Sequence, residues 1–420
     1  MENENKERGG KYEIRQPIVT IAGHVDHGKT TILDSLRGSA VASKEAGKIT
    51  QKISFTQFPS DNIRKSCYLI DKKGVNLKIP GFLFVDTPGH QAFTNLRKRG
   101  GSLADMAILV IDINEGIMPQ TQEVLKILKQ NGTPFIIALN KIDRLSGWNK
   151  KEEDIKKNIE SQARHAKQEF DQKLYKLIAA IQQHGFDSDL FYRVDDFKNQ
   201  VAIVPCSAET KEGLPELVMT LCGLSQKFLA EQLKLGKKAR GVVFEIKKEQ
   251  AINYVEAILH DGKLEEDQEI AIATFSKPFV TKVRSLEEIR PISDKFENTK
   301  EAKAATGIRM QLTDTEDILP GMPFQEFDNN LEEIEKEFKE QIGEIAKTDR
   351  EGIIVKADSL GSLEALLKLL RQNNIKVVKA GVGNIGKSDI VAAKANRDEP
   401  LNACIVGFNV GFEEDTRRIR

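Results

Sequence analysis

The chain has few cysteines and no long apolar stretch. Its 420 residues include four cysteines, which lie far apart without C-x-x-C spacing, so the sequence predicts neither a zinc site nor a disulfide framework. No run approaches the roughly 18 apolar residues that a membrane span requires. The charged residues 1–11 lack the apolar core of a signal peptide. We therefore expect a cytoplasmic protein without a membrane segment, beginning with a short flexible tail over residues 1–11.

An excess of positive charge is also missing. Lys and Arg together number 63, as do Asp and Glu, so no overall field draws the protein to nucleic acid, and any contact with RNA must be local. Hydrophobic residues make up 40% of the chain and charged residues 30%, which is typical of folded proteins. With domains of about 100 to 200 residues, this length predicts two to four of them.

Residues 12–230 alternate short apolar runs with longer amphipathic ones, which predicts an α/β domain on a mostly parallel sheet. Residues 67–71 and 82–86 are joined too closely for a parallel crossover, so we expect this pair of strands to be antiparallel. The predicted strands are residues 17–22, 67–71, 82–86, 106–112, 134–140 and 201–205.

Between residues 149 and 185, apolar side chains recur at steps of three and four, which predicts one long amphipathic helix. The simpler interpretation is a helix that packs on the domain, and the alternative is an arm that binds a partner. We favour packing, because a single apolar stripe is what any surface helix carries. The stripe consists of Ile155, Ile159, Ala163, Ala166, Phe170, Leu174, Leu177, Ile178 and Ile181.

The second half of the chain has a different pattern of apolar residues. After a linker at residues 231–239, short alternating runs separated by turn signals predict a β-barrel domain at residues 240–328, with a hairpin turn at Asp261-Gly262. A connecting helix is predicted within residues 329–350. Residues 351–420 return to an α/β pattern, with strands at 352–357, 375–381 and 404–408 and helices at 362–373 and 388–395. We expect this third α/β domain to be incomplete.

One stretch indicates what the first domain binds. Residues 23–30 read GHVDHGKT and match the phosphate-binding loop, or P-loop, G-x-x-x-x-G-K-[ST]. In such a loop, backbone amides cradle the phosphates, the lysine (Lys29) reaches the β- and γ-phosphates, and the hydroxyl (Thr30) binds Mg²⁺. An apolar run precedes the loop and a helical pattern follows it, which is the context that the motif requires.

A second motif follows the apolar run at residues 82–86. Asp86 stands at the carboxyl end of this predicted strand, where it can hold Mg²⁺ directly or through water. The backbone amide of Gly89 can approach a γ-phosphate. His90 can orient the attacking water, a task that a glutamine performs in small GTPases.

A third motif, Asn140-Lys141-Ile142-Asp143, closes another apolar run. The Asp143 carboxylate can accept hydrogen bonds from N1–H and the exocyclic amine of guanine, a pair that adenine does not offer. A buried carboxylate left unpaired penalises the wrong base by about 10⁴ or more. Ser207-Ala208, after the run at 201–205, is expected to supply a backbone amide to the guanine oxygen. The predicted nucleotide is therefore GTP or GDP.

Thr50 completes the set. It lies between the first helix and Asp86, where a threonine can join the Mg²⁺ shell only when a γ-phosphate is present. A loop that the γ-phosphate orders and hydrolysis releases is a two-state element.

With these motifs in place, the chain resembles the translational GTPases, and within them the archaeal-type translation initiation factor 5B family, relatives of bacterial initiation factor two. The segments that carry the resemblance are residues 23–30, 45–51, 86–104, 140–148 and 204–217. Residues 283–286 and 356–365 resemble that family's barrel and third domain, so the likeness covers nearly the whole chain.

The resemblance implies a P-loop GTPase domain, a β-barrel and a small α/β domain. It implies catalysis by His90, Lys29 and Thr50, and Mg²⁺ ligation by Thr30, Thr50 and Asp86. It also implies a monovalent cation near Asp26 and an apolar gate of Val25 and Ile49 beside His90. The implied nucleotide-binding residues are Gly23, His24, Val25, Asp26, His27, Gly28, Lys29, Thr30, Thr31, Asp86, Gly89, Asn140, Lys141, Asp143, Ser207 and Ala208.

The chain departs from the family pattern in two respects. Lys48, Lys52, Ser54 and Phe55 replace the usual residues around the switch threonine, which puts the switch's ribosome contact and flexibility in doubt. The family also continues through a long helix to a C-terminal barrel that grips initiator tRNA, whereas this chain ends at Arg420. We expect either a fragment or a protein completed by a second polypeptide, and the tRNA contact is in doubt.

The resemblance implies a GTPase that promotes the joining of ribosomal subunits in translation initiation, with hydrolysis triggered by the ribosome, and we expect a monomer. The alternative is a nucleotide-gated module that binds the ribosome after hydrolysis has been lost. A third interpretation, elongation or selenocysteine-tRNA delivery, is disfavoured by the likeness of the third domain.

Overall fold

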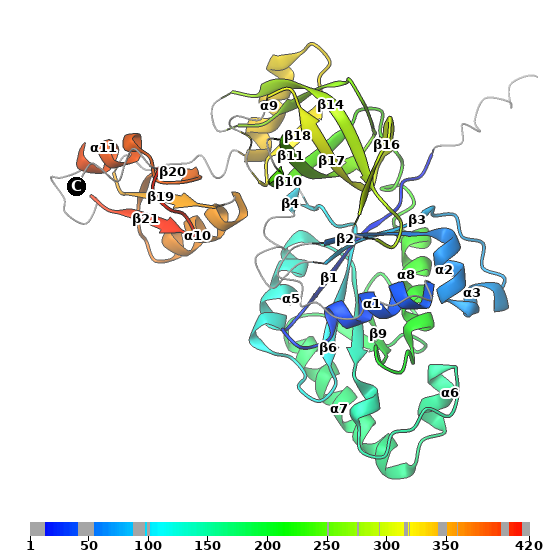
Figure 1. The fold of residues 1–420 in the computed structure, drawn as a ribbon. Helices are drawn as coiled ribbons and strands as arrows, with labels where there is room; N and C mark the ends of the chain where they lie inside the picture. The colour runs from blue at the N-terminus through cyan, green and yellow to red at the C-terminus, as the bar shows by residue number, and fades with distance from the viewer. Residues whose placement is uncertain are drawn as a thin grey trace, which may run out of the picture.

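The computed structural model describes residues 13–40, 54–86, 97–98, 101–249, 252–274, 277–293, 295–314, 318, 320–342, 351–358, 360–395 and 403–413. It contains a mixed α/β part, a β-barrel and a small parallel α/β part, in chain order (Figure 1). This agrees with the predicted fold class. Among the described residues, no helix is long and apolar enough to cross a membrane.

The first part is built on a seven-stranded sheet with the order β2-β3-β1-β6-β7-β9-β8. Neighbouring strands run parallel except β2, which pairs antiparallel with β3. The central strands are continuous apolar runs because helices cover both faces of the sheet. The strands are β1 (Ile18–Gly23), β2 (Ser54–Pro59), β3 (Gly81–Asp86), β6 (Met106–Asp112), β7 (Phe135–Asn140), β8 (Asp187–Leu190) and β9 (Gln200–Pro205). A separate short pair, β4 (Arg97–Lys98) and β5 (Gly101–Ser102), is antiparallel.

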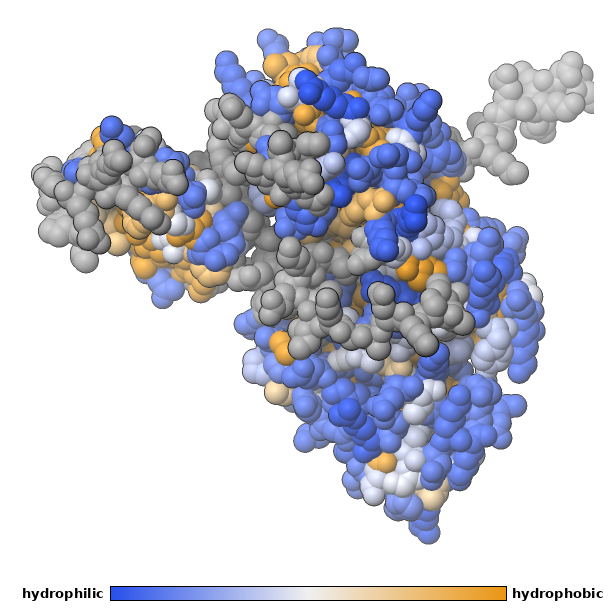
Figure 2. Space-filling model, viewed as in Figure 1, coloured by the Kyte–Doolittle hydropathy of each residue, from blue (hydrophilic) through white to orange (hydrophobic). Residues whose placement is uncertain are grey.

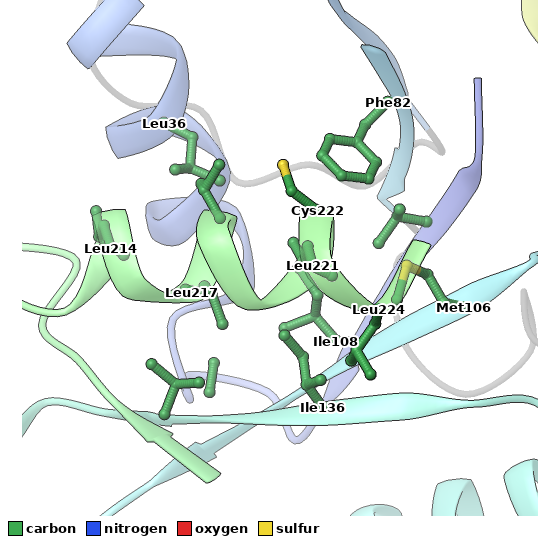
Figure 3. Packing of buried hydrophobic residues seen from close by; sticks show 14 of the residues in the cluster. Leu36, Phe82, Met106, Ile108, Ile136, Leu214, Leu217, Leu221, Cys222 and Leu224 are labelled. Carbon is green, nitrogen blue, oxygen red and sulfur yellow. The ribbon is translucent and has the colours of Figure 1, made fainter. Parts of the chain in front are cut away.

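Two hydrophobic clusters hold the helices on the sheet. One cluster joins α1 (Lys29–Ala40), α2 (Ser60–Ser66), α3 (Tyr68–Lys72) and α8 (Leu214–Phe228) to one face. Figure 3 shows α8 across the strands, with Leu217, Leu221 and Leu224 near Ile108 and Ile136. The other cluster joins α5 (Pro119–Asn131), the 3-10 turn η1 (Ile142–Arg144), α6 (Ile155–Glu160) and α7 (Arg164–Gln183) to the opposite face.

The strand predicted at residues 67–71 is wrong. Cys67 precedes helix α3 (Tyr68–Lys72), in which Leu69 and Ile70 are buried while Tyr68 is exposed. A short apolar run does not distinguish a strand from a buried turn of helix. The antiparallel partner of β3 is instead β2, which the sequence interpretation missed.

The single helix predicted between residues 149 and 185 is two helices. The break lies between α6 and α7, where the Gln162 side chain donates to the carbonyls of Asn149 and Asn158 at 2.6 and 3.0 Å. These bonds hold an irregular segment that apolar periodicity does not report. The buried face of α7, with Phe170, Leu174 and Ile181, packs on the sheet, as the simpler interpretation predicts.

The barrel is a ring of six antiparallel strands, β13-β18-β10-β11-β17-β14, closed by the pairing of β13 with β14. The predicted hairpin at Asp261-Gly262 is wrong, because β12 pairs with β16 rather than with β11. Gly262 does adopt a positive φ of 70°. The strands are β10 (Arg240–Glu249), β11 (Ile252–Asp261), β12 (Lys263–Glu265), β13 (Glu269–Ile272), β14 (Phe279–Ile289), β15 (Phe296–Asn298), β16 (Glu301–Lys303), β17 (Thr306–Leu312) and β18 (Pro323–Glu326).

The barrel is joined to the first part through β2. Phe55 stacks edge to face on Phe244 of the barrel, with ring centroids 5.0 Å apart, and a Cβ on Gly307 would lie 3.0 Å from the Phe55 ring. The Gln57 carbonyl accepts a hydrogen bond from the Ile292 amide at 2.9 Å. Phe55, one of the departures from the family pattern, therefore packs between the two parts.

The third part has three parallel strands in the order β20-β19-β21. Its elements are β19 (Ile353–Ala357), α10 (Leu360–Gln372), β20 (Val377–Val382), α11 (Lys387–Ala395) and β21 (Ile405–Phe408), and α9 (Leu331–Ile342) precedes them. Each was predicted within a few residues of its bounds. Figure 2 shows a mostly hydrophilic face on the first part and a larger share of apolar surface on this third part.

Candidate nucleotide-binding site

The P-loop connects β1 to α1 at the carboxyl edge of the sheet (Figure 1). Gly23 and Gly28 have φ values of +146° and +95°, which L side chains rarely adopt. The Lys29 ammonium group donates to the carbonyls of Gly23 and His24 at 3.1 and 2.7 Å. Burial lowers the pKa of Lys29, and the charges of Asp86 and Asp26 oppose that shift. The lysine thus lies over the loop, in reach of an anion held there.

Two oxygen ligands meet beside the loop. The Thr30 hydroxyl lies 3.3 Å from Asp86 Oδ2, because β3 runs parallel to β1 and brings Asp86 opposite Ile21. A hydroxyl and a carboxylate are hard oxygen donors of the kind that Mg²⁺ prefers. The two residues therefore fit a magnesium site.

Asn140 ties three segments together. Its amide nitrogen donates to the His27 carbonyl at 2.9 Å, and its amide oxygen accepts from the Ala208 amide at 3.1 Å. Asn140 is buried, so the nitrogen and the oxygen of its side-chain amide both bond to the protein rather than to a base. Its role is to hold the P-loop against the loop at residues 207–208.

Lys141 and His27 hold the P-loop through hydrogen bonds and ion pairs to neighbouring segments. Lys141 Nζ donates to the Asp26 carbonyl at 2.6 Å and forms an ion pair with Asp112 at 2.9 Å. His27 is fully buried, with Nδ1 3.3 Å from the Val110 carbonyl and Nε2 3.0 Å from Glu115. Burial lowers the pKa of His27, against the opposing bonds to Val110 and Glu115. Sequence reasoning missed Asp112 and Glu115, although Asp112 ends an apolar strand as Asp86 does.

The candidate base-binding residues lie on neighbouring loops. Asp143 lies in η1, half-buried, and its carboxylate has no hydrogen bond to any part of the chain that the structure describes. The expected free amides at residues 207–208 are engaged: Ser207 N donates to the Glu212 carbonyl at 2.9 Å, and Ala208 N donates to Asn140. The predicted contact of these amides with a guanine oxygen stays a prediction, and it would require one amide to be shared in a three-centre bond.

Three predicted residues, Thr50, Gly89 and His90, lie outside the described residues, as does Ile49. Asp26 has a positive φ of 65° and Val25 is half-exposed. The cation near Asp26 and the apolar gate stay predictions.

Replacing Gly28 with alanine should weaken GDP binding about tenfold or more. The new Cβ would lie 2.4 Å from Asn140 Nδ2 at a φ of +95°, so the buried amide must move and lose its bonds, at a cost of about 1 to 3 kcal/mol. The matched control is Gly38→Ala in α1, where a Cβ meets nothing within 4 Å and should stabilise the helix by about 1 kcal/mol. Equilibrium titration with GDP and thermal unfolding of both variants provide the measurement. GDP binding by Gly28→Ala as tight as wild type would contradict this account of Asn140.

The fold and the P-loop define a class of protein. A mostly parallel sheet with a phosphate-binding loop after its first strand is the architecture of the P-loop nucleotide hydrolases. The sequence model of the elongation factor Tu GTP-binding domain matches residues 15–227. The chain is a GTPase, with a GTP-binding domain of this type.

The family follows from the rest of the chain. The sequence model of translation-initiation factor 2 matches residues 325–420. The chain is 45% identical to the probable translation initiation factor IF-2 of Methanopyrus kandleri, over 97% of this chain and 70% of that protein. It is 46% identical to that of Archaeoglobus fulgidus, over 96% of this chain and 70% of that protein. The chain belongs to the translation initiation factor IF-2 family.

A solved structure agrees. The crystal structure of GDP-bound aIF5B from Aeropyrum pernix has a TM-score of 0.81 and 39% sequence identity, and the match covers 96% of this chain and 70% of that one. The resemblance drawn from the motifs is thereby confirmed. The chain spans about 70% of the length of these relatives.

Proposed function

We propose that this GTPase promotes the joining of ribosomal subunits during translation initiation in the cytoplasm, and that the ribosome triggers its hydrolysis of GTP. The observation that carries the proposal is the identity of 45% to a translation initiation factor over 97% of this chain, and the position of β2 adds a structural link between the switch and the barrel. This strand follows the predicted switch threonine Thr50 in the chain, and its Phe55 packs on Phe244 of the barrel. A change in the switch therefore has a direct path to the barrel.

The proposed reaction is in-line attack of water on the γ-phosphate, which depends on positioning and charge stabilisation. Lys29 and the loop amides hold the phosphates, and His90 orients the water. Thr30 and Asp86, 3.3 Å apart, would hold Mg²⁺ together with Thr50, and such an ion would supply positive charge beside the phosphate oxygens. Asp143 selects guanine, and Asn140 and Lys141 keep the P-loop in place beside it.

Ribosomes should accelerate this reaction. The purified protein is expected to hydrolyse GTP slowly on its own. Both ribosomal subunits together should raise the rate of hydrolysis by about tenfold or more, because an arginine or a partner that assists a GTPase raises its rate by about 10³ to 10⁵. Phosphate release measured with no ribosome, each subunit and both subunits provides the test. Cosedimentation with each subunit under GTP, GDP and no nucleotide separates binding from catalysis. Equal hydrolysis rates with and without ribosomes would overturn the triggered mechanism.

A second candidate is a nucleotide-gated module that binds the ribosome without significant hydrolysis. The observation in its favour is the set of residues around Thr50 that differ from the family pattern. One of them, Phe55, packs on the barrel. In that case GTP stabilises one arrangement of the switch and the barrel. Nucleotide-dependent cosedimentation would remain, while phosphate release on the ribosome would not rise.

A further inference from the structure

Glu212 is a buried acidic residue that the site described above does not use. It lies just before α8 and is 3% exposed. One carboxylate oxygen, Oε1, accepts from Trp148 Nε1 at 3.2 Å and from Asn158 Nδ2 at 2.6 Å. The other, Oε2, accepts from the Thr210 hydroxyl. Three donors from three segments thus converge on one side chain.

Two of these donors, Trp148 and Thr210, belong to the two loops that flank the candidate base site, and the third, Asn158, lies in α6. Trp148 is on the loop that begins with Asp143, and successive turns, Leu145 N to Ile142 O and Trp148 N to Leu145 O, both at 3.1 Å, connect the two. Thr210 is on the loop that begins with Ser207, and its amide donates to the Ser207 hydroxyl at 3.1 Å. The Glu212 side chain therefore links the loop of Asp143 to the loop of Ala208.

The backbone of Glu212 makes a further link. Its carbonyl accepts from the Ser207 amide at 2.9 Å. Glu212 therefore contacts the loop twice, through its main chain at Ser207 and through its side chain at Thr210. Trp148 is also held by packing on Phe170, with ring centroids 5.7 Å apart. The carboxylate thus has little freedom to move away from either loop.

We propose that Glu212 is a positioning residue for guanine recognition, which sets the affinity and selectivity for the base by fixing the separation of Asp143 and Ala208. This inference rests on the proposed guanine site. Glu212 makes none of the expected base contacts itself, and it acts through Trp148 and Thr210. Because its three partners are donors, removing the carboxylate leaves buried N–H groups unpaired, and the loops separate to hydrate them.

The chemistry of the three donors distinguishes a positioning role from simple space filling. Trp148 and Asn158 present N–H groups that only donate, whereas the Thr210 hydroxyl can donate or accept. The amide oxygen of a glutamine at position 212 can accept the hydrogen bonds of Trp148 and Asn158, and its amide nitrogen can donate to Thr210 Oγ1. Glu212→Gln should therefore retain the link between the loops, and Glu212→Ala should lose it.

The test compares variants of the 420-residue chain by GDP and IDP affinity and by GDP dissociation rate. IDP lacks the exocyclic amine that Asp143 is proposed to bind. Glu212→Ala is expected to weaken GDP binding by about 10- to 100-fold and to reduce the GDP-to-IDP affinity ratio. Glu212→Gln should restore most of both affinity and selectivity.

Two further variants keep the test decisive. Leu221→Ala removes a fully buried side chain from α8, the helix that follows Glu212, and should lower thermal stability without changing the GDP-to-IDP ratio. Thr210→Val removes one hydrogen bond from a half-buried position, and a several-fold loss of GDP affinity is expected even if Glu212→Ala fails to fold.

The outcomes separate this inference from the proposed site. A folded Glu212→Ala, or Thr210→Val in its place, with an unchanged GDP-to-IDP ratio would overturn the positioning role. So would an equal loss of selectivity in Leu221→Ala. If Asp143→Asn also leaves base preference unchanged, the guanine site itself fails. If Asp143→Asn alters preference and the Glu212 series does not, only the role of Glu212 fails.

Discussion

Replacing Asp143 with asparagine is expected to lower the affinity for GTP by about 10⁴ and to favour xanthosine triphosphate. A carboxylate accepts two hydrogen bonds from guanine, at N1–H and the exocyclic amine. An asparagine amide presents one acceptor and one donor, which matches xanthine, where a carbonyl replaces the amine. Asp143 is half-buried in η1 with no hydrogen bond from its carboxylate within the described chain, so the swap disturbs little else.

Competition titrations with GDP and XDP, together with turnover of GTP and XTP, measure this shift. The matched control is Asp71→Asn, which changes an exposed carboxylate in an ion pair with Arg64 and should leave both affinities unchanged, since exposed pairs contribute little to stability. Unchanged GTP affinity in Asp143→Asn would contradict the assignment of the base site. A loss of binding to all four nucleotides would mean that the substitution damaged the loop rather than its specificity.

The arrangement of the P-loop, Asp86 and Asn140 was predictable because these motifs are local, whereas Thr50, Gly89 and His90 lie outside the described residues. The P-loop carries its own glycines, its preceding strand is a plain apolar run, and parallel strands must end at one edge of a sheet. The structure accordingly brings Thr30 to Asp86 and Asn140 to His27. The three-part fold was predictable for the same reason, since each part has its own periodicity.

The supporting residues were not predictable, because their contacts join distant parts of the chain. Glu115 meets His27 and Glu212 meets Trp148 across long sequence separations, and no local pattern marks a glutamate as an acceptor for a buried donor. Asp112 is the exception, since it ends a buried strand and pairs with Lys141. Burial raises the pKa of Asp112, but the bonds from Lys141 and Asn114 outweigh it and hold the pKa below its usual value.

Prediction from local pattern also failed where a strand and a helix can have the same short apolar pattern. Residues 67–71 form a short apolar run that predicts a strand, yet Cys67 and Ile70 are buried, with Ile63, in the cluster that joins α2 and α3 to the sheet. β2 was missed because its apolar residues, Phe55 and Phe58, are separated by polar ones and it ends in a proline. Its burial comes from two sides, the sheet and the barrel, and the barrel contact exists only in the folded protein.

Replacing His90 with alanine should slow ribosome-stimulated GTP hydrolysis by about 10² to 10⁴, the usual contribution of a group that orients and polarises an attacking nucleophile. GTP and GDP affinities should stay within about twofold of wild type, because Lys29, Asp143 and the loop amides are unchanged. The control is His184→Ala, which alters a histidine at the end of α7, away from the P-loop. Single-turnover phosphate release on ribosomes, with cosedimentation measured in parallel, gives both quantities.

The same experiment decides between the two proposed functions. If wild type hydrolyses GTP on the ribosome and His90→Ala binds but does not hydrolyse, the variant should remain attached to joined subunits, since hydrolysis precedes release in the cycle that we propose. If wild type and His90→Ala have equal, slow rates and equal nucleotide-dependent cosedimentation, His90 has no catalytic role and the non-hydrolysing module is correct. In that case the path from Thr50 through Phe55 to the barrel still transmits the presence of a γ-phosphate, and exchange of nucleotide rather than its hydrolysis ends the bound state.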